Sequence, residues 1–154
     1  MKKLKFAKWE NYEKDGIKYI PGTVGYYACA SGDIFKLFGI DSKEPYLKKV
    51  TSSIRKSDDY CVAAVTWIKI GRKVELVHRL IAKTFLGECP KGYEVNHKDH
   101  VRYHNFLSNI EYKLIKENRG EHCNQKEYQN SWRERVADKA LYDELYHSEI
   151  RIFV

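Results

Sequence analysis

The segment VNHKDHVRYHNFLSNIEYKLIKENR, Val95 to Arg119, decides the fold of this 154-residue chain. It places Asn96 beside His97, Asn109 twelve residues after His97, and Asn118 nine residues after Asn109. Carboxamide oxygens are hard donors that suit Mg²⁺, and a cation on a DNA phosphate needs few protein ligands because phosphate and water complete its shell. His97 is the candidate base, since the ordinary pKa of histidine lies near neutrality. The spacing is typical of a nuclease metal site.

The residues around these positions predict a short run of secondary structure. YEVNH, residues 93–97, is extended, a polar loop follows, and IEYKL, residues 110–114, predicts a second strand before a helix that carries Asn118. In VHRLIAKTFLG, residues 77–87, apolar residues recur every three or four positions, which predicts a short helix that ends at Gly87 and packs its apolar side on a sheet.

The preceding residues predict a small antiparallel sheet made of two hairpins. Residues 26–30 and 33–38 flank the Ser31-Gly32 pair, and residues 60–70 and 73–77 flank Gly71-Arg72. A connection rich in Lys and Ser joins the two hairpins.

The C-terminal tail predicts one helix of about five turns from Gln125 to His147, after an N-cap and capping-box pair. The last residues, IRIFV, are expected to return to the body as a strand. The apolar stripe of this helix can pack on the body or form a homodimer, and the sequence leaves both open. The fold class is therefore α+β, with an N-terminal β module (1–75), a core (76–122) and a helical tail (123–154).

The charge distribution favours a phosphate-binding surface. Lys and Arg number 28 against 21 Asp and Glu, and residues 1–122 hold 23 of the basic and 15 of the acidic side chains. The four cysteines are widely spaced without a CxxC pair, which favours reduced thiols. No stretch approaches the roughly 20 apolar residues of a membrane span, so the sequence predicts an intracellular protein without a membrane partner.

The spacing of His97, His100 and His104 allows a different interpretation, in which these residues bind structural zinc together with Cys89 or Cys123. Three asparagines at the spacing described above would then be coincidental. A zinc-stabilised interaction domain therefore stays as an alternative function.

Several of these motifs together resemble a known family. VHRLIAKTFLG, VNHKDH, HNFLSNIEY and ENR resemble the HNH homing endonucleases of phages and mobile introns, whose nuclease core is the ββα-metal fold. The upstream YYACASGDIFK and the valine-rich hairpin resemble the β module that often precedes that core. The resemblance covers roughly residues 9–119.

The resemblance implies a role for each matching position. Asn96 and Asn118 would bind one Mg²⁺ or Mn²⁺ ion, His97 would be the general base, and Asn109 would brace the loop that orients His97. Asn96 stands where many relatives have Asp, so the free protein should bind metal weakly. His100 stands where a glycine or another small turn residue is frequent.

The implied function is a DNA endonuclease that nicks double-stranded DNA as a monomer or homodimer, encoded by a phage or mobile element and acting in the cytoplasm of the infected bacterium. The alternative is a catalytically weak or inactive DNA-binding protein of the same fold. The residues expected to contact DNA are basic and lie in the core and the β module: Arg79, Lys98, Arg102, Arg119, Arg72, Lys73, Lys69 and Arg55.

Overall fold

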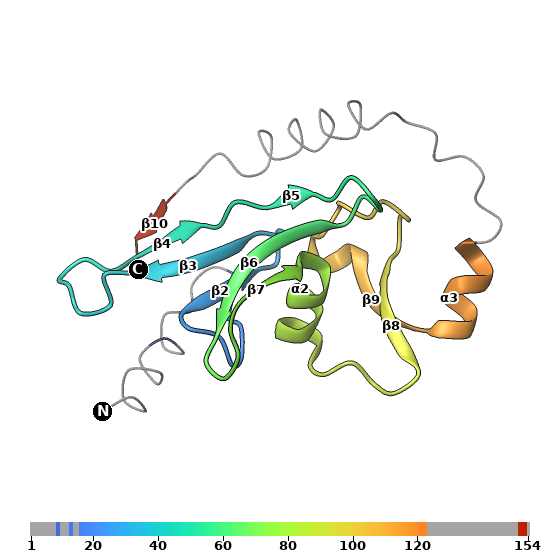
Figure 1. Ribbon diagram of the computed structural model, residues 1–154, viewed down its shortest axis with the longest axis horizontal. Helices are drawn as coiled ribbons and strands as arrows, with labels where there is room; N and C mark the ends of the chain where they lie inside the picture. The colour runs from blue at the N-terminus through green and yellow to red at the C-terminus, as the bar shows by residue number, and fades with distance from the viewer. Residues whose placement is uncertain (1–8, 10–12, 14–15, 123–150, 154) are drawn as a thin grey trace.

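The computed structural model describes residues 9, 13, 16–122 and 151–153. The predicted helix from Gln125 to His147 lies outside these residues. The described residues form two antiparallel sheets, a two-stranded ribbon and two α-helices (Figure 1). The five-stranded sheet has the order β1(Ile17–Tyr19), β2(Tyr26–Cys29), β3(Ile34–Phe38), β4(Tyr46–Lys49), β10(Arg151–Phe153). The three-stranded sheet comprises β5(Ser53–Ile54), β6(Cys61–Trp67) and β7(Gly71–Leu76).

The remaining elements follow in chain order. Helix α2(Val77–Leu86) leads to β8(Tyr93–His97), then to the 3₁₀ turn η1(Leu107–Asn109), β9(Ile110–Leu114) and α3(Ile115–His122). The predicted strand, loop, strand and helix are therefore confirmed. Among the described residues no helix is both long and apolar enough to cross a membrane.

The β module differs from the sequence prediction in its strands, its sheets and one turn. It forms two sheets instead of one, and it contains the unpredicted strand β1. The predicted connection contains β4 and β5, in which Leu47 and Ile54 are buried while the neighbouring Lys48 and Ser53 are exposed. The first hairpin, β2–β3, is confirmed. In the second, Trp67 pairs with Gly71, so the turn comes before Gly71-Arg72; Gly71 has a φ of +78° and ends that turn.

The end of the chain returns to the first sheet, as predicted. Strand β10 pairs antiparallel with β4, and Ile152 lies opposite Leu47.

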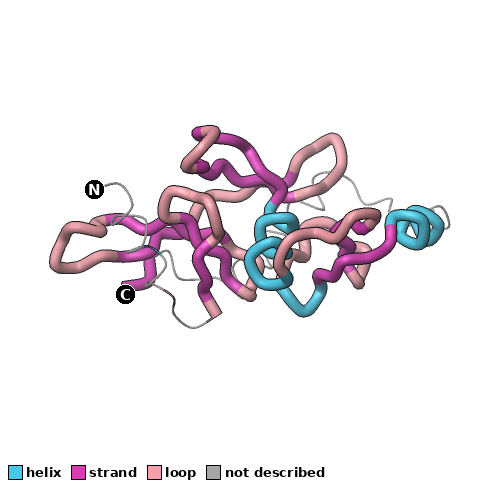
Figure 2. Tube along the Cα trace, turned by 90° about the horizontal axis from the view of Figure 1, so that it is seen from below, coloured by secondary structure: helices cyan, strands magenta, loops and turns pink. Residues whose placement is uncertain are grey.

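Helix α2 lies between the β module and the β8–β9 ribbon (Figures 1 and 2). Its buried residues Val77, Leu80 and Ile81 share one hydrophobic core with residues of both sheets, including Ile34 and Val65. The helix ends at Gly87, which has a φ of +84°. The predicted amphipathic helix is confirmed, and it connects the two halves of the molecule through one core.

The turn of the β2–β3 hairpin contacts the loop between β8 and β9 directly. The Leu107 backbone N–H donates to the Ala30 carbonyl at 2.7 Å. Gly32 has a φ of +97°, and a Cβ at this position would lie 2.7 Å from the carbonyl carbon of Asn105. Only glycine fits this contact without displacing the loop.

Gly32→Ala should therefore destabilise the protein more than Gly71→Ala. Both substitutions place alanine at positive φ, at a cost of about 1–2 kcal/mol, but nothing lies within 4 Å of a Cβ at Gly71. The overlap with the Asn105 backbone should add about 1–3 kcal/mol. Urea unfolding of the two variants measures the difference, and equal losses would contradict the close contact.

Candidate active site

The ribbon β8–β9 and helix α3 bring the predicted metal ligands together. In the antiparallel register Asn96 lies opposite Glu111, and His97 lies opposite Ile110. Helix α3 follows β9 without a linker and packs against both strands, and it carries Asn118. Glu94 and Asn96 are two residues apart on β8, so they share one face of the ribbon with Glu111.

The side chain of Asn109 closes the loop between the two strands. Its Oδ1 accepts the Asp99 backbone N–H at 3.0 Å, and its Nδ2 donates to Asp99 Oδ1 at 2.9 Å and to the His104 carbonyl at 2.8 Å. The Asn109 carbonyl also accepts the Lys98 N–H at 2.8 Å. Asn109 is buried and holds the loop that begins directly after His97. His100, in this loop, has a φ of +61°, a conformation that a glycine or a small turn residue adopts more easily.

Asn96 and Asn118 have the same unusual hydrogen-bonding pattern. The Asn96 Nδ2 donates to Glu111 Oε1 at 3.0 Å, and the Asn118 Nδ2 donates to Glu94 Oε1 at 2.7 Å. Both side chains are buried, and the Oδ1 of each has no hydrogen-bond partner within the described part of the chain. An unpaired buried carbonyl costs about 1–3 kcal/mol, so both oxygens are suited to an electropositive ligand. Two carboxamide oxygens fit a hard divalent cation.

The His97 ring is buried and held by one hydrogen bond. Its Nε2 lies 2.9 Å from Asn105 Oδ1, which can only accept a hydrogen bond, so Nε2 carries the proton and the lone pair is on Nδ1. Burial lowers the pKa of His97 below its ordinary value, although the Asn105 hydrogen bond acts in the opposite direction. The ring is therefore unprotonated at neutral pH. Sequence analysis did not assign Asn105 to the site, because an asparagine in a turn-rich run carries no distinguishing signal.

The rings of His78 and Tyr60 lie close to the His97 ring. The ring of His78 stacks on Tyr60 with centroids 4.8 Å apart, and it lies 5.0 Å from the His97 ring. His78 is 3% exposed, and its Nδ1 has no partner among the described residues. Burial lowers the pKa of His78 to about 3, with a smaller contribution from His97. The buried His78 ring is therefore neutral at neutral pH.

A cavity of about 280 Å³ is lined by Tyr60, His78 and Asn118, among other residues. Three of the arginines predicted to contact DNA line it: Arg79, Arg102 and Arg119. Arg102 also lies over the Tyr60 ring at 5.0 Å and donates to the Asp58 carbonyl at 3.0 Å. The cavity thus combines fixed positive charge with one candidate metal ligand.

The other predicted DNA contacts lie elsewhere. Lys98 is exposed directly after His97, and Lys69, Arg72 and Lys73 lie on or beside the β6–β7 turn. Arg55 forms a bidentate ion pair with Asp58, which raises the pKa of Arg55 and lowers that of Asp58. Its charge is thus already neutralised by a neighbour.

The histidines of the zinc alternative have other partners. His97 binds Asn105, and the His104 Nδ1 lies 2.7 Å from Asp99 Oδ2. No group of three His, Cys, Asp or Glu side chains with metal-binding geometry occurs among the residues that the structure describes. Cys123 lies outside those residues.

Comparison with known proteins shows similarity to a nuclease family in the segment that holds this site. Residues 75–119 match the family model described as HNH endonuclease. This segment of the chain is therefore similar to the HNH endonucleases, and the resemblance inferred from the sequence is confirmed.

Two individual proteins are similar over larger parts of the chain. The SPbeta prophage-derived protein YosQ of Bacillus subtilis (strain 168), whose name assigns it to the HNH homing endonucleases, is 39% identical over 72 residues, which are 47% of this chain and 42% of YosQ. A solved structure of the HNH homing endonuclease I-HmuI, titled for DNA binding and cleavage, matches with a TM-score of 0.56 and 24% identity, covering 79% of this chain and 66% of that one. The chain spans less than two thirds of either protein, and the structural match confirms the mixed fold.

The buried His78 should make the protein acid-sensitive. Unfolded His78 binds a proton below pH 6.5, whereas folded His78 does so only near pH 3, so the unfolded state binds more protons between these values. The free energy of unfolding should fall as the pH drops through this window. Between pH 6.5 and 4.5, the free energy of unfolding of His78→Phe should fall by about 2 kcal/mol less than that of the wild type. Urea unfolding at each pH measures this difference.

Tyr60→Phe is the matched control, because it keeps the stacked ring and leaves His78 in place. It should retain the full pH dependence of the wild type. An unchanged dependence in His78→Phe would show that His78 is not the responsible group.

Proposed function

We propose that this protein is a metal-dependent DNA endonuclease of the homing type, which hydrolyses phosphodiester bonds and nicks one strand. Two observations carry the proposal: His97, which directly follows Asn96 on β8, is buried and neutral, and the carboxamides of Asn96 and Asn118 are buried with oxygens that have no partner among the described residues. A prophage origin of the similar YosQ supports a phage or mobile element as the source.

Asn96 and Asn118 would hold one Mg²⁺ or Mn²⁺ ion through their Oδ1 atoms. Two protein ligands leave most of the coordination shell to water and to phosphate oxygens, as is usual for Mg²⁺ on a nucleic acid. When bound, such a cation neutralises the charge that develops on the phosphate and on the departing 3′ oxygen.

The protein's own side chains supply the proton transfer and the phosphate contacts. His97 takes a proton from the attacking water at Nδ1, and the Asn105 oxygen accepts the hydrogen bond from Nε2 throughout the step. Arg79, Arg102 and Arg119 line the adjacent cavity, where they can hold the phosphodiester and its neighbours. One base and one cation site serve one strand, which favours nicking by a monomer.

His97→Ala should slow DNA nicking by about 10²- to 10⁴-fold, because general-base assistance is lost. The measurement is the relaxation of supercoiled plasmid in Mg²⁺, with DNA affinity measured alongside and expected to stay unchanged. Added imidazole should restore part of the rate to the variant and leave the wild type unaffected. Equal relaxation by wild type and variant would end the assignment of the base.

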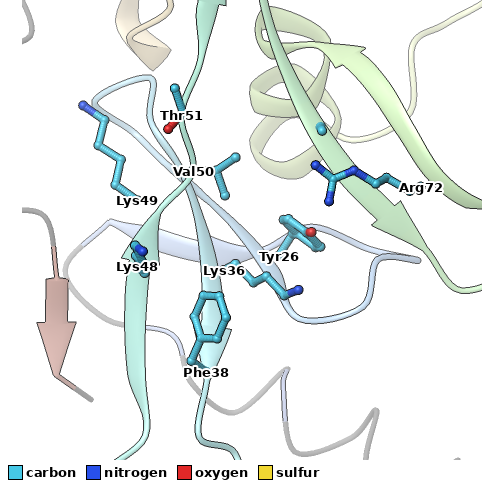
Figure 3. Close-up of a pocket in the computed structure, with 9 residues that line it drawn as sticks. Tyr26, Lys36, Phe38, Lys48, Lys49, Val50, Thr51 and Arg72 are labelled. Carbon is cyan, nitrogen blue, oxygen red and sulfur yellow. The ribbon is translucent and has the colours of Figure 1, made fainter.

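The β module offers a second basic surface for the flanking duplex. Lys36, Lys48, Lys49 and Arg72 line a pocket of about 340 Å³ between the two sheets, together with Tyr26 and Phe38 (Figure 3). Lys49 is paired with Asp33 at 3.1 Å, whereas Lys36 lies over the Tyr26 and Phe38 rings at 5.4 and 5.3 Å. We propose that this pocket binds the DNA backbone outside the cleavage site.

Lys36→Ala and Lys48→Ala should each reduce the salt dependence of DNA binding. Loss of one phosphate contact lowers the slope of log K against log salt concentration by about 0.9. Lys43→Ala is the control, because Lys43 is exposed and does not line the pocket. Fluorescence anisotropy with a labelled duplex between 50 and 200 mM salt measures the slopes. Identical slopes in the Lys43 and Lys36 variants would place the DNA elsewhere.

A catalytically weak DNA-binding protein is the second candidate, favoured by the neutral carboxamide of Asn96 at a position where many relatives have Asp. This function would give salt-sensitive DNA binding without cleavage in either Mg²⁺ or Mn²⁺. The plasmid assay described above separates the two candidates.

A further inference from the structure

We infer that Glu94 and Glu111 are positioning residues of the metal site, which orient the carboxamides of Asn118 and Asn96 and supply the negative charge that these neutral ligands lack. The inference rests on the proposed metal site. It concerns two residues that neither the spacing of the motif nor the family match singles out.

The two glutamates fix the orientation of the asparagine side chains. An asparagine side chain has an oxygen at one end and an NH₂ group at the other, and only the oxygen can bind a cation. An ionised glutamate can accept hydrogen bonds but not donate them, so it pairs with the NH₂ end alone. Glu111 accepts from Asn96 at 3.0 Å and Glu94 accepts from Asn118 at 2.7 Å. Each glutamate therefore turns the Oδ1 of its asparagine away from itself, and both oxygens are left unpaired and buried.

The second argument is the position of the two glutamates on the ribbon. Glu94 precedes Asn96 by two residues, and Glu111 lies opposite Asn96 on β9, so the two carboxylates flank one ligand on the same face. Helix α3 packs against β8, and Asn118 on this helix donates a hydrogen bond to Glu94. The two pairs are therefore parts of one constellation built on adjacent strands.

The third argument is charge. Asn96 and Asn118 together contribute no formal charge, whereas the two glutamates contribute two negative charges directly behind them. Hydrogen bonds to an ionised acceptor are about twice as strong as neutral ones and polarise the amide, which increases the partial negative charge on Oδ1. The opposing positive groups are Lys113, across the ribbon from Glu94, and Arg79 and Arg119, which line the cavity beside Glu94.

An aspartate ligand would carry its negative charge itself, whereas here the charge lies on the glutamate that accepts a hydrogen bond from the asparagine. The pair Asn96–Glu111 has the same net charge as an Asp–Gln pair with the hydrogen bond reversed. Asn96→Asp alone would place two carboxylates about 3.0 Å apart, at the distance of the present hydrogen bond. An aspartate at this position is therefore expected to function only when residue 111 can donate.

The experiment measures Mn²⁺ binding to the full chain without DNA, by water-proton relaxation up to millimolar Mn²⁺, and Mg²⁺-dependent nicking in parallel. Glu111→Gln and Glu94→Gln should each weaken Mn²⁺ binding by about 10- to 100-fold, as expected for loss of an outer partner of a metal ligand. Asn96→Asp should not strengthen binding. The double variant Asn96→Asp/Glu111→Gln should return to within a few-fold of the wild type, which also shows that the site still folds.

Glu117→Gln is the matched control, because Glu117 is exposed next to Asn118 in the sequence, on the same helix. It removes one negative charge without removing a hydrogen bond to Asn96 or Asn118. Full Mn²⁺ affinity in this variant would support the inference that Glu94 and Glu111 act by orienting the two carboxamides. A loss equal to that of Glu111→Gln would show that only the overall charge matters and would overturn the inference.

Two further outcomes separate the inference from the proposed function. If Asn96→Ala and Asn118→Ala abolish Mn²⁺ binding while both glutamate variants bind normally, the metal site stands and the positioning role is wrong. If the wild-type protein binds no Mn²⁺, or binds it equally well without either asparagine, the metal site itself is wrong and the inference falls with it.

Discussion

The pairing of β8 with β9 in a single register is the constraint on which the candidate site depends. Side chains alternate between the two faces of a strand, so a slip of one residue would move Asn96 away from Glu111 and to the other face of the ribbon. The side chain of Asn109 opposes such a slip, because its hydrogen bonds to Asp99 and His104 set the course of the loop between the strands. Asn109 therefore helps to hold Asn96 in its register opposite Glu111.

The β module supports this ribbon as well as presenting basic residues. Its first hairpin meets the loop at Gly32 and Ala30, beside Asn105, the residue that holds the His97 ring. Tyr60, at the start of the second hairpin, stacks on His78, whose ring in turn lies 5.0 Å from the His97 ring. The environment of His97 thus depends on contacts made by residues that lie 37 to 67 positions earlier in the chain. The module and the core are better regarded as one structural unit than as a binding domain joined to a nuclease.

The sequence predicted the elements that follow periodicity or turn chemistry. Helix α2, the strands of the ribbon, the helix carrying Asn118 and the first hairpin are all marked locally, by apolar spacing or by Gly and Ser at turns. It did not predict β4 and β5, because each is short and only Leu47 or Ile54 in them faces the core. The same limit applies to the site. The motif spacing identified His97, Asn96 and Asn118, whereas Asn105, Glu94 and Glu111 acquire their positions only through tertiary contacts.

The electrostatics of the site favour an unprotonated base beside positive charge. Burial and Arg102 both lower the pKa of His97, and a bound cation would act in the same direction. A carboxylate at position 105 would carry a charge that raises that pKa and competes for the cation, whereas Asn105 raises the pKa through its hydrogen bond alone and carries no charge. The negative charge is placed on Glu94 and Glu111, which contact the carboxamides of Asn118 and Asn96. In the proposed mechanism, the charge that would attract the metal therefore lies on residues other than Asn105, which holds the His97 ring.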